Sequence, residues 1–112
     1  MATVQGVDCV VALKALAEAT RLRILQLLFK APLSVNDLSE QLDVSQYNVS
    51  KHLRTMREAR LLEVEKQGRL HLYSVSRDLR TQVAANKNIL DLGCCAFKLD
   101  DLSSQEATRR RS

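Results

Sequence analysis

The chain has 112 residues, of which 46% are hydrophobic and 4% aromatic, and this length suits one compact domain rather than two. With one proline and three glycines, the composition favours a mainly helical fold with a core of Leu, Val, Ile and Ala. The formal net charge of +4 and a pI of about 9.2 suit a polyanionic partner, although ordinary soluble proteins share such values.

Membrane and secreted proteins are disfavoured. No apolar segment approaches the roughly 18 to 20 residues of a membrane-spanning helix, and the N-terminus lacks the basic start and apolar run of a secretory signal. The three cysteines, two of them adjacent, do not form the even, spaced set of a secreted disulfide scaffold. We therefore expect a cytoplasmic protein with free thiols. These thiols would react, bind a metal, or simply pack as small apolar side chains.

Two helices are predicted in the first third of the chain. Apolar residues recur at helical spacing within residues 8–18, which indicates a first helix. Thr20 is a suitable N-cap for a second helix, and residues 22–29 of that helix are almost all apolar. We expect this second helix to lie at the centre of the core.

The next segment has the pattern of a helix-turn-helix. Pro32 interrupts the chain, and Ser34 followed by Asp37 resembles a capping box that opens a third helix ending near Asp43. Ser45 then caps a fourth helix. Two short helices joined by a tight turn typically place the start of the second helix in the DNA major groove, so DNA binding is the leading hypothesis.

The polar residues that open the fourth helix have side chains suited to DNA. Amides such as those of Gln46 and Asn48 fit the edge of adenine, and a helix N-terminus attracts phosphate. Lys51 and Arg54 face outward and should meet the phosphate backbone, although a charged surface would look the same in a protein that binds no DNA.

A β-hairpin is predicted after the fourth helix. Residues 62–66 and 69–75 alternate apolar and polar side chains around Gln67 and Gly68, which is typical of a two-stranded hairpin. Such a hairpin directly after a recognition helix forms a wing. Arg69 at its tip is placed equally well in a minor groove or in solvent.

His52 lies beside the inward-facing Val49 and Leu53, so packing or phosphate positioning is preferred there over metal ligation. The predicted DNA-binding residues are Ser45, Gln46, Tyr47, Asn48, Ser50, Lys51, His52, Arg54 and Arg69.

The last part of the chain predicts a dimerisation helix. From Ser76, apolar residues together with Asn86 and Gly93 follow spacings of four and three as far as Phe97, which is a heptad seam. A single seam at the end of a small domain needs a partner, so we expect a homodimer. We assign residues 1–100 to one DNA-binding and dimerisation domain and residues 101–112, which include Arg109 to Arg111, to a flexible polar and basic tail.

This order of elements resembles the ArsR/SmtB family of winged-helix repressors. The resemblance spans about residues 10–98 and is carried by two stretches, LAEATRLRIL at residues 16–25 and SQYNVSKHL at residues 45–53. It implies a mainly α winged helix-turn-helix with a small β-hairpin wing, dimerising through its terminal helices. It also implies a homodimer that occupies palindromic operator DNA and leaves it when a metal, metalloid or oxidant reaches cysteine or histidine ligands.

Most sensor sites of that family have no counterpart in this chain. Where arsenic and cadmium sensors often read Cys-Val-Cys at the start of the third helix, this chain reads Ser34-Val35-Asn36. No histidine follows His71, so the zinc site of the last helix lacks its ligands, and the fourth helix has no cysteine. The remaining candidate ligands are Cys9, Cys94 and Cys95.

These cysteines suit a soft, thiophilic ligand. Trivalent arsenic or antimony prefers three sulfurs in a pyramid, and this chain has three. In a helix Cys94 and Cys95 would point about 100° apart, so both can bind one atom only where the helix ends or distorts, which Gly93 makes easy. In the family, the first helix lies against the last helix of the dimer, usually that of the other chain, which would bring Cys9 close. A two-thiolate site for an organoarsenical, without Cys9, is the alternative.

Other readings remain open. Cys9 with Cys94 or Cys95 could form a redox pair that closes a disulfide or polysulfide bridge, and a buried cysteine can serve simply as a small apolar residue. A winged-helix DNA binder without a ligand is a further possibility. An enzyme is disfavoured, since the sequence has no Cys-x-x-Cys on a strand-to-helix turn, no Ser-His-acid set and no glycine-rich phosphate loop. The choice among arsenite, organoarsenicals, antimonite, cadmium and bismuth is not fixed by sequence.

Overall fold

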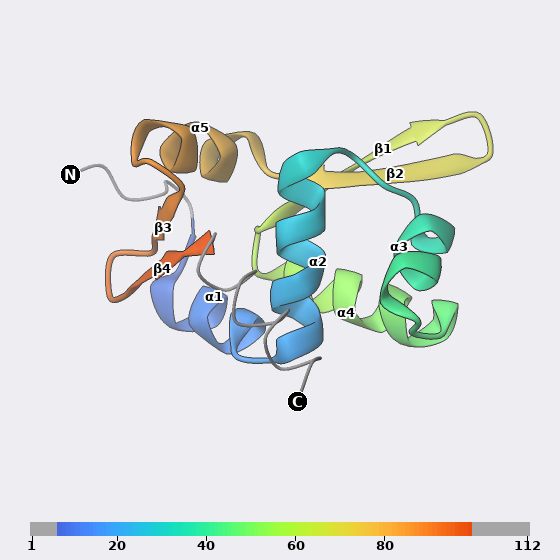
Figure 1. Ribbon diagram of the computed structural model, residues 1–112, viewed down its shortest axis with the longest axis horizontal. Helices are drawn as coiled ribbons and strands as arrows, with labels where there is room; N and C mark the ends of the chain where they lie inside the picture. The colour runs from blue at the N-terminus through green and yellow to red at the C-terminus, as the bar shows by residue number, and fades with distance from the viewer. Residues whose placement is uncertain (1–6, 100–112) are drawn as a thin grey trace.

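The computed structural model describes residues 7–99, in which four helices precede a long hairpin and a fifth helix precedes a short one (Figure 1). The elements are α1 (Cys9–Leu16), α2 (Ala19–Lys30), α3 (Val35–Leu42), α4 (Gln46–Glu58), β1 (Leu62–Gln67), β2 (Leu70–Val75), α5 (Arg77–Ala85), β3 (Ile89–Asp91) and β4 (Ala96–Lys98). This order confirms the predicted winged helix-turn-helix, mainly α with a hairpin wing. The predicted tail at residues 101–112 lies outside the described residues, and the division at residue 100 stays a prediction.

Serine caps begin three of the helices where the sequence predicts them. Ser34 and Asp37 form the reciprocal capping box of α3, in which each side chain bonds the backbone N–H of the other. The hydroxyl of Ser45 accepts from Asn48 at the start of α4, and Ser76 caps α5. Each cap satisfies a backbone donor that a helix start leaves unpaired, which stabilises the helix by about 1 kcal/mol.

The predicted cap at Thr20 is wrong. Helix α2 begins earlier, and its N-cap is Glu18, whose carboxylate accepts from the backbone N–H of Arg21 at 3.0 Å. Glutamate is rarely chosen as an N-cap, and the threonine two residues later is the more usual signal. The earlier start leaves a short break between α1 and α2, spanned by Ala17 and Glu18.

Aliphatic side chains form the core, as the composition predicts. Helix α2 contributes Ile24, Leu25 and Leu28, and all three are buried. The other fully buried large side chains are Leu16, Leu38, Val49, Leu53, Met56, Leu61, Val75, Leu79 and Leu90. Each such side chain stabilises the fold by about 1.5–3 kcal/mol relative to exposure. None of the helices within residues 7–99 has the length and apolar character that crossing a lipid bilayer requires.

The wing is the antiparallel hairpin of β1 and β2, closed by Gly68 and Arg69. Gly68 has a φ of +64°, the conformation that the first position of a two-residue hairpin turn requires and that glycine adopts without strain. Leu33 pairs with Tyr73 through two backbone hydrogen bonds of 2.8 and 3.0 Å, which fasten the wing to the loop before α3.

The predicted long terminal helix is wrong beyond Ala85. Asn86 ends α5, and Lys87 and Asn88 then adopt positive φ values of 56° and 67°, a left-handed conformation in which a helix cannot continue. The chain returns instead as the β3–β4 hairpin. The heptad spacing predicted a helix here, but its apolar position Leu90 is buried equally well in strand β3.

The buried side chain of Gln82 holds this hairpin against α5. Its amide donates to the carbonyl of Asp91 at 3.1 Å and accepts from the N–H of Asp91 at 3.3 Å, thus pairing both backbone groups of one β3 residue. Helix α1 and the β3–β4 hairpin lie at one end of the molecule, whereas α3 and the wing lie at the other (Figure 1).

Candidate functional site

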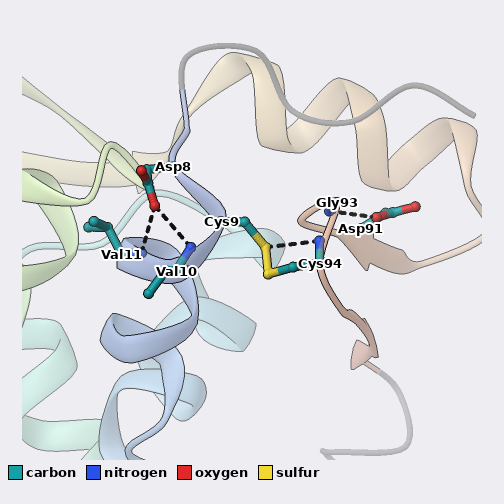
Figure 2. Close-up of a disulfide and its surroundings, with 7 residues drawn as sticks. All are labelled: Asp8, Cys9, Val10, Val11, Asp91, Gly93 and Cys94. Carbon is teal, nitrogen blue, oxygen red and sulfur yellow. Dashed lines mark hydrogen bonds between the residues drawn. A yellow bond between two sulfur atoms is a disulfide. The ribbon is translucent and has the colours of Figure 1, made fainter.

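The three cysteines meet at the end of the molecule formed by α1 and the β3–β4 hairpin. Their sulfur atoms all lie within 4.8 Å of one another, although Cys9 is 85 residues away from Cys94. Cys9 and Cys94 are joined by a disulfide with a Cα–Cα distance of 6.0 Å (Figure 2). Cys95 is free and half-buried. The sequence-predicted ligands are therefore together within one chain.

Local backbone structure positions the Cys9 sulfur. Asp8 caps α1 by accepting from Val10 and Val11 at 3.0 and 3.1 Å, which places Cys9 in the first turn (Figure 2). The N–H of Cys94 donates to the sulfur of Cys9 at 2.9 Å.

The turn that carries Cys94 and Cys95 is built around Gly93. Gly93 has a φ of +97°, and its N–H donates to the carboxylate of Asp91 at 2.8 Å. The carbonyl of Cys95 accepts from the N–H of Leu92 at 2.9 Å, closing the turn between β3 and β4. In a turn, the side chains of adjacent cysteines need not point about 100° apart as they would in a helix. The sulfurs of Cys94 and Cys95 therefore both lie close to that of Cys9.

The predicted DNA-binding residues of α4, together with Ser45 before it and Arg69 in the wing, are exposed apart from His52. Tyr47 is 72% exposed, and the ammonium of Lys51 lies 5.3 Å from the centre of its ring. Arg54 forms an exposed ion pair with Glu58 at 3.5 Å, and Arg69 is exposed at the tip of the wing. The other exposed members of the set are Ser45, Gln46, Asn48 and Ser50.

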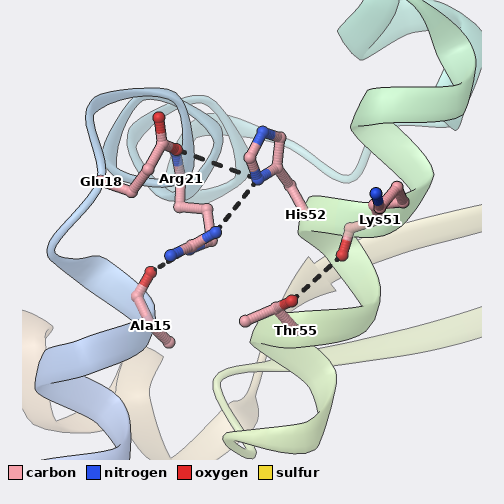
Figure 3. A network of polar contacts seen from close by, with 6 residues as sticks. All are labelled: Ala15, Glu18, Arg21, Lys51, His52 and Thr55. Carbon is pink, nitrogen blue, oxygen red and sulfur yellow. Dashed lines mark hydrogen bonds and ion pairs between the residues drawn. The ribbon is translucent and has the colours of Figure 1, made fainter.

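His52 differs from the rest of the set because it is half-buried in a polar network that faces α2 (Figure 3). Its Nδ1 lies 3.2 Å from Nη1 of Arg21 and 3.9 Å from a carboxylate oxygen of Glu18. Arg21 also donates from Nε to the carbonyl of Ala15 in α1. His52 therefore packs α4 against the junction of α1 and α2, whereas phosphate positioning by His52 stays a prediction.

Glu18 is electrostatically coupled to this network. Burial raises the pKa of Glu18, but N–H donors from Arg21 and Thr20 and the charges of His52 and Arg21 lower it, so its pKa lies below the ordinary value. The carboxylate of Glu18 therefore remains ionised through the neutral range and attracts the positively charged guanidinium of Arg21.

Sequence reasoning missed two sets of side-chain contacts made by α4. Gln46 donates from Nε2 to Oδ1 of Asn36 at 2.9 Å, and Asn36 donates in turn to Glu40. In the sequence, Asn36 stands out only because it occupies a position where sensors of the resembled family often carry a cysteine. The stretch from Glu18 to Arg21 stood within a recognised motif, but nothing in its spacing indicated a contact with His52.

Comparison with known proteins agrees with this architecture. Residues 13–64 match the family described as "Bacterial regulatory protein, arsR family". The arsenical resistance operon repressor of Staphylococcus xylosus is 32% identical over 85 residues, which are 73% of this chain and 82% of that protein.

The transcriptional activator HlyU of Vibrio cholerae is 40% identical over 67 residues, or 60% of this chain and 62% of HlyU. The structure of its reduced form has a TM-score of 0.60 at 35% identity and covers 68% of this chain and 81% of that chain.

The homodimeric winged helix-turn-helix domain of Mb0332 from Mycobacterium bovis shares the fold, with a TM-score of 0.63, 24% identity, and coverage of 70% of this chain and 73% of that chain. The sequence and structural matches together extend over most of the described residues. The chain therefore belongs to the arsR family of bacterial regulatory proteins, which are DNA-binding transcriptional regulators and not enzymes.

Proposed function

We propose that this protein is a transcriptional repressor that binds operator DNA as a homodimer and is released when trivalent arsenic or antimony binds the thiolates of Cys9, Cys94 and Cys95. The observation that carries the proposal is the convergence of these three sulfurs within 4.8 Å, from opposite ends of the chain. The resemblance to an arsenical resistance operon repressor supports it.

The chemistry of the donor set fits the proposed inducer. Arsenous acid and three thiols form a tris-thiolate and three waters, so the three sulfurs supply a complete pyramidal coordination set. Binding requires the disulfide between Cys9 and Cys94 to be reduced first, which takes two electrons and two protons and returns both thiols. Oxidised protein is then expected to ignore arsenite.

Helix α1 offers a route from the thiols to the recognition helix. Cys9 lies in its first turn, and Ala15 near its other end accepts from Arg21, which contacts His52 of α4. A ligand that pulls Cys9 toward the β3–β4 hairpin changes how α1 supports Arg21. The ligand affects DNA affinity only through different affinities for the two arrangements, typically by about 1–3 kcal/mol.

The exposed surface of α1 supports the proposed homodimer. Val10 and Val11 are 55% and 47% exposed beside the thiols, and two apolar side chains in solvent favour burial against a second copy. Mb0332, which has the same fold, is described as homodimeric. Two recognition helices related by a two-fold axis would read a palindromic operator, and the protein would act in the cytoplasm with the DNA.

Titration of arsenite against the complex of the reduced protein with operator DNA tests the proposal. We expect arsenite to release wild-type protein, and Cys9→Ser, Cys94→Ser and Cys95→Ser each to weaken the response at least tenfold without changing DNA affinity in its absence. Release of a variant that lacks all three cysteines would contradict the proposal. A response retained by Cys9→Ser alone would favour the two-thiolate organoarsenical site.

The disulfide favours one second candidate, a repressor of the same fold that senses oxidants or persulfides. Loss of two electrons and two protons from the thiols of Cys9 and Cys94 forms the bond found in the structure. DNA affinity that differs between oxidised and reduced Cys95→Ser, with no response to arsenite in the reduced wild type, would select this candidate. Affinity that ignores both treatments would indicate a ligand-independent DNA binder.

A further inference from the structure

A relay of hydrogen bonds runs along the surface from α3 to the first residue of α4. Asn36 donates from Nδ2 to Oε1 of Glu40 at 3.4 Å, one helical turn away. Gln46 donates from Nε2 to Oδ1 of Asn36 at 2.9 Å. All three side chains are exposed, and they bridge the two helices of the helix-turn-helix.

Glu40 sets the direction of every bond in this relay. An ionised carboxylate can only accept, so Asn36 turns its NH₂ group toward Glu40. The carbonyl of Asn36 then faces Gln46, and the group of Gln46 that can donate to a carbonyl is its NH₂. The amide of Gln46 is therefore held in one of its two orientations.

This orientation determines what Gln46 offers to a ligand. One N–H bonds Asn36, and the carbonyl Oε1 and the second N–H remain available on an exposed side chain at the start of α4. Adenine presents a donor at N6 and an acceptor at N7 in the major groove, which matches this pair. Guanine presents two acceptors, and its O6 would oppose the Gln46 carbonyl.

We propose that Asn36 and Glu40 are positioning residues that fix the Gln46 amide and thereby give the protein a preference for adenine at one base pair of each operator half-site. The proposal rests on the proposed function, since it assumes that the first turn of α4 meets the major groove. A relay that merely joined α3 to α4 would change the affinity for every duplex equally and leave base preference untouched.

The test uses the reduced full-length protein and an operator obtained by selection from a randomised duplex library. The dissociation constant is measured for all four base pairs at each position, and for a non-specific duplex, at one salt concentration. Gln46→Ala identifies the base pair that Gln46 reads. We expect wild-type protein to prefer adenine there by about tenfold or more.

Asn36→Ala is the principal variant, because it removes the relay at an exposed helical position where alanine favours the helix. The adenine preference should fall to about threefold or less at the base pair identified by Gln46→Ala. Preferences at the other positions and the affinity for the non-specific duplex should stay within twofold of wild type.

A rescue pair separates orientation from simple loss of contacts. Glu40→Gln supplies a side chain that can donate as well as accept, so the relay loses its fixed direction and the adenine preference should weaken. Adding Asn36→Asp to Glu40→Gln puts an acceptor-only group in the middle of the relay, which again obliges Gln46 to donate. The double variant should regain most of the adenine preference.

The outcomes distinguish this inference from the proposed function. Equal weakening of all duplexes by Asn36→Ala, or unchanged base preferences in Gln46→Ala, overturns the inference and leaves the repressor intact. A double variant no more selective than Glu40→Gln also overturns it. Wild-type protein that binds no duplex better than the non-specific one contradicts the proposed function, and the inference with it.

Discussion

Nδ1 of His52 on α4 lies 3.2 Å from Nη1 of Arg21 on α2, so α4 is tied near its middle to the helix that follows α1. The guanidinium of Arg21 has only donors, so Nδ1 is the acceptor in this contact. The same guanidinium also bonds Ala15 of α1. Arg21 is thus the residue through which three helices share a polar contact.

Arg21→Gln should lower the free energy of unfolding by about 1–2 kcal/mol, because it removes the donors to Ala15 and His52 in a half-buried setting. Urea denaturation measures the change. Arg54→Gln is the matched control, since Arg54 is exposed and its ion pair with Glu58 stabilises the fold by less than about 0.5 kcal/mol. Equal effects of the two substitutions would mean that the Arg21 contacts contribute nothing beyond a surface pair.

The network predicts a loss of stability in acid. The pKa of Glu18 is lower in the folded than in the unfolded protein, so its contribution is fully present above the unfolded pKa and disappears as pH falls through the folded pKa. Glu18→Gln should therefore be less stable than wild type near neutral pH, and the difference should shrink as pH falls below about 4. Denaturation curves recorded across this range test the sign, and a difference that grows on acidification would contradict it.

The disulfide predicts a redox-dependent stability. Joining residues 85 apart restricts the unfolded chain, so oxidised protein should exceed reduced protein by about 2–4 kcal/mol in the free energy of unfolding. Cys94→Ser should abolish the difference. Cys95→Ser is the control and should retain it, and its loss in that variant would show that Cys95 shares the bond. Urea denaturation with and without reductant provides the measurement.

Gln82→Leu should destabilise the protein by about 1–3 kcal/mol, because both backbone groups of Asp91 lose their buried partner. It should also loosen the β3–β4 hairpin and slow formation of the bond between Cys9 and Cys94 in mild oxidant, as followed by thiol counting. Thr81→Ala changes an exposed neighbour on α5 and should affect neither measurement. An unchanged rate of bond formation in Gln82→Leu would show that Gln82 does not position the hairpin.

Short-range signals predicted the helix-turn-helix and the wing because each depends on few residues. Ser34 and Ser45 each cap a helix by accepting from the backbone N–H three residues ahead, and Gly68 permits the turn of the wing. The end of α5 could not be predicted in this way. Leu90 fits both the heptad spacing of a helix and the alternation of a strand. The strand is held by the bond between Gln82 and Asp91, a contact that forms only once the chain has folded.

The candidate sites were predictable as residue types but not as arrangements. Elimination of other ligands pointed to Cys9, Cys94 and Cys95, yet a helix was expected to carry the last two, whereas a turn does. Asn36 gave no signal of its own, because an exposed asparagine in a helix has many possible partners. Its role follows from Glu40 and Gln46 lying on either side of it.

The bond between Cys9 and Cys94 makes the polypeptide a covalent ring, and every strand and helix from α2 to β3 lies on that ring. A protease that cleaves the exposed turn at Gly68 and Arg69 would thus produce two fragments that still migrate together on a denaturing gel without reductant. Adding reductant would let them separate. Digestion of this kind reports the state of one pair of sulfurs from the far end of the molecule.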